Sequence, residues 1–170
     1  MAKGRDEVDG GETYDGMTVV LCIGNRYMGD DGVGREVAGR LRGMDLGPGV
    51  LVRESVSVDL ATLWEFRAAR RLLVVDAVTS GDRPGTVTRH LLLGGDRTTP
   101  KLAGLHGLDL GSAVDLAAPE ILGTGVVVVG VEPKDCGARE GLTPEVGAAV
   151  TEAVEAILSE LSAAGAGRRV

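Results

Sequence analysis

An acidic pair lies inside a glycine-rich turn near the start of the sequence. Residues 20–23 form the apolar run VLCI, and residues 24–34 then read GNRYMGDDGVG, with Asp30 and Asp31 adjacent. In an open α/β sheet, such a strand-to-helix turn lies at the carboxyl edge of the strands, where ligands bind. One acid suffices to stabilise the turn or to cap the helix that follows. We therefore assign Asp30 to the turn and Asp31 to a functional site.

Two further residues are expected at the same edge of the sheet. Asp76 ends a second apolar run, residues 71–76, so its carboxylate should emerge beside that of Asp31. An aspartate after a strand often only caps the next turn, but two carboxylates in one crevice either share a proton or bind a cation. His106 precedes an expected helix, whose N-terminus disfavours protonation and leaves a neutral imidazole. Two carboxylates and an imidazole form a plausible site for a divalent first-row metal.

Other residues suggest weaker alternatives. Cys136 and His106 are conceivable as a nucleophilic dyad, although nothing around Cys136 resembles a nucleophile motif. Glu54 ends an apolar run where a dinucleotide-binding unit would place its ribose-binding acid, yet the glycines of the turn follow neither GxGxxG nor a P-loop pattern. The second histidine, His90, is expected at a half-exposed position within a strand.

Composition limits the classes of protein to consider. The chain has 170 residues, 44% of them hydrophobic, which predicts one domain with one core. A net charge of −7 argues against nucleic-acid binding. Neither a secretory signal nor a membrane-spanning run is expected, and the two cysteines form no CxxC pair, so we expect a cytoplasmic protein. Residues 1–16 are expected to form a disordered tail, residues 17–164 the domain and residues 165–170 a frayed end.

The elements that position these residues follow a β-α-β-α-β order, which predicts parallel strands with right-handed crossovers. Strands are expected at residues 17–23, 50–56, 71–76, 85–92 and 126–130, and helices at 31–41, about 57–67, 108–117 and 143–164. The connection at residues 77–84 is too short for a helical crossover, so strand 85–92 should run antiparallel. Residues 93–105 should then return across the sheet and bring His106 to the site. The expected fold is a three-layer α/β/α sandwich around a five-stranded, mostly parallel sheet with one antiparallel strand.

Four motifs in this order resemble those of the hydrogenase maturation endopeptidases. They are GNxxxxDDGxG from residue 24, DAVxSGxxPG from residue 76, a lone histidine before a helix, and GVxP followed by GLTPEV from residue 130. The resemblance covers roughly residues 18–160. It implies that Asp31, Asp76 and His106 contact a metal, thought to be the nickel that the substrate already holds.

The sequence also departs from the family's pattern. The family often has Gly at Cys22, Glu at Asp31, Ser shortly before the histidine where residues 103–105 are Ala-Gly-Leu, and Asp-Gly-Gly-Thr where residues 54–57 are Glu-Ser-Val-Ser. The altered turn after the second strand bears on substrate selection more than on the fold.

The resemblance implies a metal-dependent endopeptidase that removes the C-terminal extension of a nickel-loaded [NiFe] hydrogenase large-subunit precursor, with Asp31, Asp76 and His106 carrying the catalysis. Metal could polarise the scissile carbonyl or activate water, or Asp31 or Asp76 could act as general base. The alternatives are a non-catalytic, metal-sensing maturation chaperone and a small dinucleotide-binding module.

Overall fold

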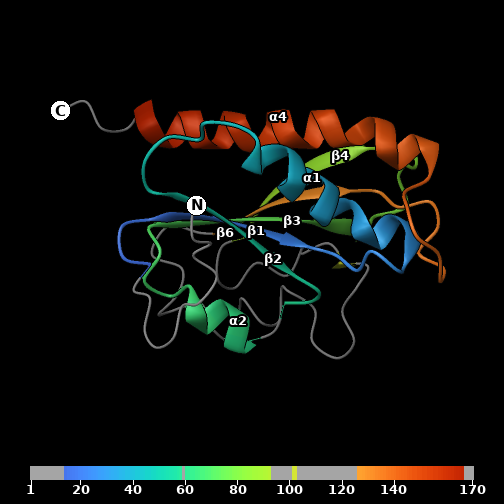
Figure 1. The fold of residues 1–170 in the computed structure, drawn as a ribbon, viewed down its shortest axis with the longest axis horizontal. Coiled ribbons are helices and arrows are strands. Elements are labelled where there is room, and N and C mark those ends of the chain that lie inside the picture. The colour runs from blue at the N-terminus through green and yellow to red at the C-terminus, as the bar shows by residue number, and fades with distance from the viewer. Residues whose placement is uncertain (1–13, 59, 93–100, 103–125, 167–170) are drawn as a thin grey trace, which may run out of the picture.

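A central sheet lies between two helical layers. The computed structural model describes residues 14–58, 60–92, 101–102 and 126–166. Helices α1 (Val33–Arg42) and α4 (Pro144–Ala166) cover one face of the sheet, and the short helix α2 (Leu60–Glu65) lies on the other face (Figure 1). The three-layer α/β/α arrangement predicted from the sequence is therefore confirmed.

The directions of the strands agree with the prediction. The main path of the sheet runs β2 (Val50–Ser55), β1 (Thr18–Ile23), β3 (Arg71–Thr79), β6 (Val126–Val131) and β4 (Val87–Leu92). The first four strands are parallel, and β4 pairs antiparallel with β6. A two-residue strand, β5 (Lys101–Leu102), adds an antiparallel pairing to the end of β3, which the sequence did not predict.

The central strands are buried on both faces, as their continuous apolar runs indicate. All six residues of β1 are buried. Val19 and Leu21 pack toward the α2 side of the sheet, whereas Val20 and Cys22 pack against α1 and α4. This alternation follows the two-residue period of a strand.

The two helices on the upper face bury the stripes that the sequence predicts. Val33, Val37, Ala38 and Leu41 are the buried apolar residues of α1. Helix α1 begins at Val33 rather than at residue 31, because residues Gly29–Gly32 form a separate 3-10 turn, η1. At the far end of α4, Arg71 and Arg89 both donate to the Glu160 carboxylate and so hold this helix against the sheet.

Several other boundaries also differ from the expected ones, and three of these differences are the most informative. Strand β3 continues past Asp76 to Thr79, because Asp76 and Ala77 still pair with Gly130 and Val131 of β6. Tyr14 is not part of a tail: its ring is buried and packs edge-on against Phe66 at 4.9 Å. Helix α4 extends to Ala166. No helix in the described part of the chain is long and apolar enough to cross a membrane.

Three predicted features lie outside the described residues. They are the return segment 93–105 apart from β5, His106 itself, and the short helix at residues 108–117.

Candidate active site

Two glycines allow the acidic turn to pack directly on β1. A Cβ atom on Gly34 would lie 2.0 Å from the carbonyl oxygen of Ile23, and one on Gly24 would lie 2.4 Å from that of Asp31. Both contacts are with backbone atoms, so no side-chain rotation could relieve them. The glycines therefore bring β1, η1 and α1 into close contact, and the packing accounts for them without a phosphate ligand.

Asp30 holds the turn to a distant part of the chain. Its carboxylate accepts hydrogen bonds from the backbone N–H groups of Lys134 and Asp135, each at 2.9 Å, and of Thr143 at 2.6 Å. The Thr143 hydroxyl donates a fourth at 2.9 Å. Burial alone would raise the pKa of Asp30, but these donors outweigh it and lower the pKa. Asp30 has the structural role expected, although its partners follow β6 rather than its own turn.

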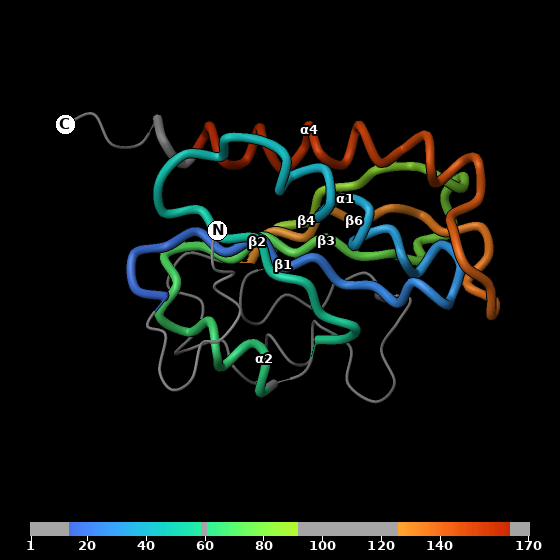
Figure 2. Tube along the Cα trace, viewed as in Figure 1, coloured from blue at the N-terminus to red at the C-terminus, as the bar shows by residue number. Residues whose placement is uncertain are grey.

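The loop that receives Asp30 runs beside the acidic turn. Gly29 donates its N–H to the carbonyl of Arg139 at 2.9 Å, and Arg139 donates to the carbonyl of Tyr27 at 3.0 Å. Figure 2 shows the two loops together at one end of the sheet. The backbone around Asp31 is thus fixed on two sides, by β1 and by the loop before α4.

The structure brings Asp31 and Asp76 together, as the sequence predicts. Asp31 is 7% exposed, and its Oδ2 accepts a hydrogen bond from the N–H of Asn25 at 3.0 Å. Asp76 is completely buried in β3, against which η1 packs. Its Oδ1 accepts a hydrogen bond from Ala77 at 2.8 Å, whereas its Oδ2 accepts none from any residue that the structure describes. Burial, and then the charge of Asp31, raise the pKa of Asp76 well above its usual range.

This pair of carboxylates can share a proton or hold a cation. A buried oxygen with no donor is costly unless something else satisfies it. Carboxylate oxygens are suitable ligands for a divalent metal. Within the described ranges no three His, Cys, Asp or Glu side chains cluster for a metal, and His106, the expected third ligand, lies outside them.

The alternative chemistries receive no support from the geometry. Burial, and then the charges of Asp31 and Asp30, raise the pKa of the Cys136 thiol to about 11, so it is neutral at physiological pH and a poor nucleophile. Arg35 and Arg42 both pair with the Glu54 carboxylate, the former at 2.9 Å, so this acid is not free to bind a ribose. His90 lies half-buried in β4, as expected, with Nε2 at 2.9 Å from the Thr88 hydroxyl.

Glu132 is a buried acid that the sequence analysis missed. Its carboxylate accepts hydrogen bonds from the N–H and hydroxyl of Ser80, each at 2.7 Å, and from the N–H of Gly81 at 3.3 Å. It therefore fixes the loop that leaves β3 just beyond Asp76. In the sequence, Asp76 and Glu132 each come at the end of an apolar run. This shared pattern could have identified Glu132 as a candidate buried acid.

Comparison with known proteins identifies the family. The family model described as hydrogenase maturation protease matches residues 57–160. The putative hydrogenase maturation protease MJ0253 of Methanocaldococcus jannaschii is 31% identical over 149 residues, which cover 84% of this chain and 95% of that protein. The chain belongs to the hydrogenase maturation protease family.

Other members support the same conclusion. The hydrogenase 3 maturation protease of Escherichia coli K12 is 28% identical over 145 residues, covering 84% of this chain and 87% of that one. The solved structure of the hydrogenase maturating endopeptidase HybD from E. coli superposes with a TM-score of 0.71 at 25% identity, covering 88% of this maturation protease and 94% of HybD. The resemblance and the fold predicted from sequence are both confirmed, and the protein is a peptidase.

Proposed function

We propose that this maturation protease removes the C-terminal extension from the precursor of a [NiFe] hydrogenase large subunit, in the cytoplasm, once nickel has been inserted. The observation that carries the proposal is the pair Asp31 and Asp76, two buried carboxylates on neighbouring elements of a peptidase fold, one of them with a buried oxygen that accepts no hydrogen bond from a described residue. In a member of a peptidase family, such a pair is suited to acid–base chemistry at a peptide bond.

The nickel belongs to the substrate in this proposal. Asp31 and Asp76, with His106 as the third ligand, would contact the ion held by the precursor. Their chemistry fits, because carboxylate and imidazole are ordinary ligands of divalent first-row metals. Docking of the ion against Asp76 would satisfy the buried Oδ2, which makes recognition depend on whether the precursor is loaded.

The chain's own residues provide proton transfer. Burial and the charge of Asp31 raise the pKa of Asp76 and favour its protonated form before a precursor binds, whereas contact with the nickel would favour its carboxylate form. The N–H of Asn25 orients the Asp31 carboxylate beside it. A carboxylate in this position can take a proton from attacking water and pass it to the leaving amine. The nickel, when present, would supply Lewis-acid activation of the carbonyl or of water.

The test is incubation of the purified protein with a nickel-loaded large-subunit precursor, followed by measurement of the precursor's mass. Loss of a C-terminal fragment supports the proposal. An intact precursor that still forms a complex with this protein would contradict it and support the maturation-chaperone alternative.

A further inference from the structure

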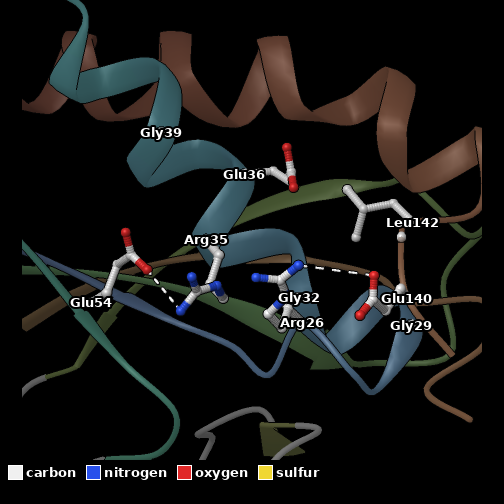
Figure 3. A pocket seen from close by; sticks show the side chains of 10 residues that line it. Arg26, Gly29, Gly32, Arg35, Glu36, Gly39, Glu54, Glu140 and Leu142 are labelled. Carbon is white, nitrogen blue, oxygen red and sulfur yellow. Dashed lines mark ion pairs between the residues drawn. The ribbon is translucent and has the colours of Figure 1, made fainter. Parts of the chain in front are cut away.

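A hollow of about 510 Å³ lies on the outer side of α1, next to the acidic turn. Its walls come from the turn, from the exposed side of α1, from the end of β2 and from the loop before α4 (Figure 3). Gly29 and Gly32, which flank Asp30 and Asp31, form part of its lining. A chain segment bound here would therefore lie against the same short turn that carries Asp31, the proposed catalytic acid. The volume is within the range of pockets that bind small molecules or side chains.

The lining contains three carboxylates and two guanidinium groups. The three carboxylates differ in how strongly they are paired with arginine side chains. Glu54 is paired with Arg35, and with Arg42 from outside the hollow. Glu140 faces Arg26 at 3.9 Å, with both side chains more than half exposed, so this ion pair is weak. Glu36 makes no ion pair with any residue in the described part of the chain.

Glu36 and Glu140, the two acids without a strong ion pair among the described residues, lie on the same side of the hollow. Figure 3 shows Glu36 and Glu140 with the apolar side chain of Leu142 beside them. Lysine and arginine side chains place their aliphatic stems on apolar surface and their charged ends against carboxylates. The net charge of −7 on the whole chain favours approach of a cationic group over an anionic one.

We propose that this hollow binds a lysine or arginine side chain of the substrate polypeptide, with the cationic end between Glu36 and Glu140 and the stem against Leu142. The proposal rests on the proposed function for the identity of the polypeptide. It makes Glu36 and Glu140 specificity-determining residues, separate from the acids that carry the chemistry.

The experiment measures the dissociation constant of the nickel-loaded precursor for the E36Q and E140Q variants and their double variant. Each single change raises the dissociation constant about twofold to fivefold, the range for an exposed ion pair. R26Q lowers the dissociation constant, because removal of the Arg26 guanidinium leaves Glu140 available to the cationic group of the substrate. E152Q, on the exposed side of α4, is the matched control and leaves the constant unchanged.

The signs of these changes decide the proposal. Unchanged binding by the double variant, or weaker binding by R26Q together with tighter binding by E36Q, would overturn it, and the second pattern would indicate an anionic occupant. Thermal unfolding of each variant shows whether the fold is retained. Cleavage is recorded separately in the same samples, so a failure of the proposed function is distinguishable from a failure of this binding site.

Discussion

Asp30 and Asp76 are both completely buried carboxylates, but Asp30 accepts four hydrogen bonds, whereas Oδ2 of Asp76 accepts none from a described residue. Their pKa values accordingly move in opposite directions, down for Asp30 and up for Asp76. The Asp30 carboxylate therefore stabilises the folded state, whereas the ionised Asp76 carboxylate destabilises it. A buried group that destabilises its own protein is typical of a functional site.

Asp76→Asn is expected to stabilise the protein at neutral pH, because folding raises the pKa of the Asp76 carboxyl and so makes its ionised form unfavourable in the folded state, a penalty that the neutral amide avoids. A carboxyl whose pKa is raised by folding contributes full stability below its unfolded pKa and loses it as the pH rises through the folded value. The difference in unfolding free energy between the variant and wild type should therefore increase from about pH 4 to pH 7. Urea unfolding at several pH values measures it. A variant less stable than wild type at pH 7 would contradict this account of Asp76.

Asp30→Asn should act in the opposite direction and cost about 2–4 kcal/mol, because an amide group cannot accept from all four donors. The pKa of Asp30 is lowered by folding, so its contribution is present above the unfolded pKa and is lost as the pH falls through the folded value. The same urea series provides the measurement. Equal stability of variant and wild type at pH 7 would mean that the hydrogen bonds to Asp30 contribute nothing net.

Gly34→Ala should destabilise the protein by about 3 kcal/mol or more, since its Cβ would lie 2.0 Å from a backbone oxygen and force β1 and α1 apart. Gly39 provides a matched control in the same helix, because a Cβ there meets nothing within 4 Å. Gly39→Ala should stabilise by about 0.5–1 kcal/mol. Thermal unfolding compares the two variants, and similar midpoints would contradict the close approach of β1 and α1.

Cys136→Ala should retain most of the peptidase activity. The thiol lies near Asp31, but its pKa of about 11 leaves it neutral at physiological pH. Initial rates of precursor cleavage by the variant and by wild type give the comparison. A loss of activity by a factor of a hundred or more, on the order of the loss on removing a catalytic group, would reinstate the cysteine as a nucleophile.

Much of the fold could be predicted from apolar runs and connection lengths. The eight residues 77–84 are too few for a helical crossover, and this length alone predicted the antiparallel β4. The extension of β3 beyond Asp76 could not be predicted in the same way, because aspartate is a poor strand residue and the extension depends on pairing with β6 and β5. Tyr14 is a similar case, since its burial depends on Phe66, which is far away in the sequence.

For the site, the rule that ligands bind at the carboxyl edge of a parallel sheet was sufficient to bring Asp31 and Asp76 together. The separate role of Asp30 was also predicted, but its partners Lys134, Asp135 and Thr143 come from a loop that no local pattern connects with it. Hydrogen bonds between segments so distant in sequence depend on tertiary packing. The place of His106 in the site stays a prediction.

The mass of the precursor's C-terminus, measured after incubation with wild-type protein or Asp76→Asn, tests the central claim most directly. Four reactions are compared, with nickel-loaded and nickel-free precursor for each protein. The account predicts that wild type shortens only the loaded precursor and that Asp76→Asn, although folded and more stable, shortens neither. Comparable cleavage of the loaded precursor by Asp76→Asn would contradict the assigned site, and equal cleavage of both precursors by wild type would contradict recognition of nickel.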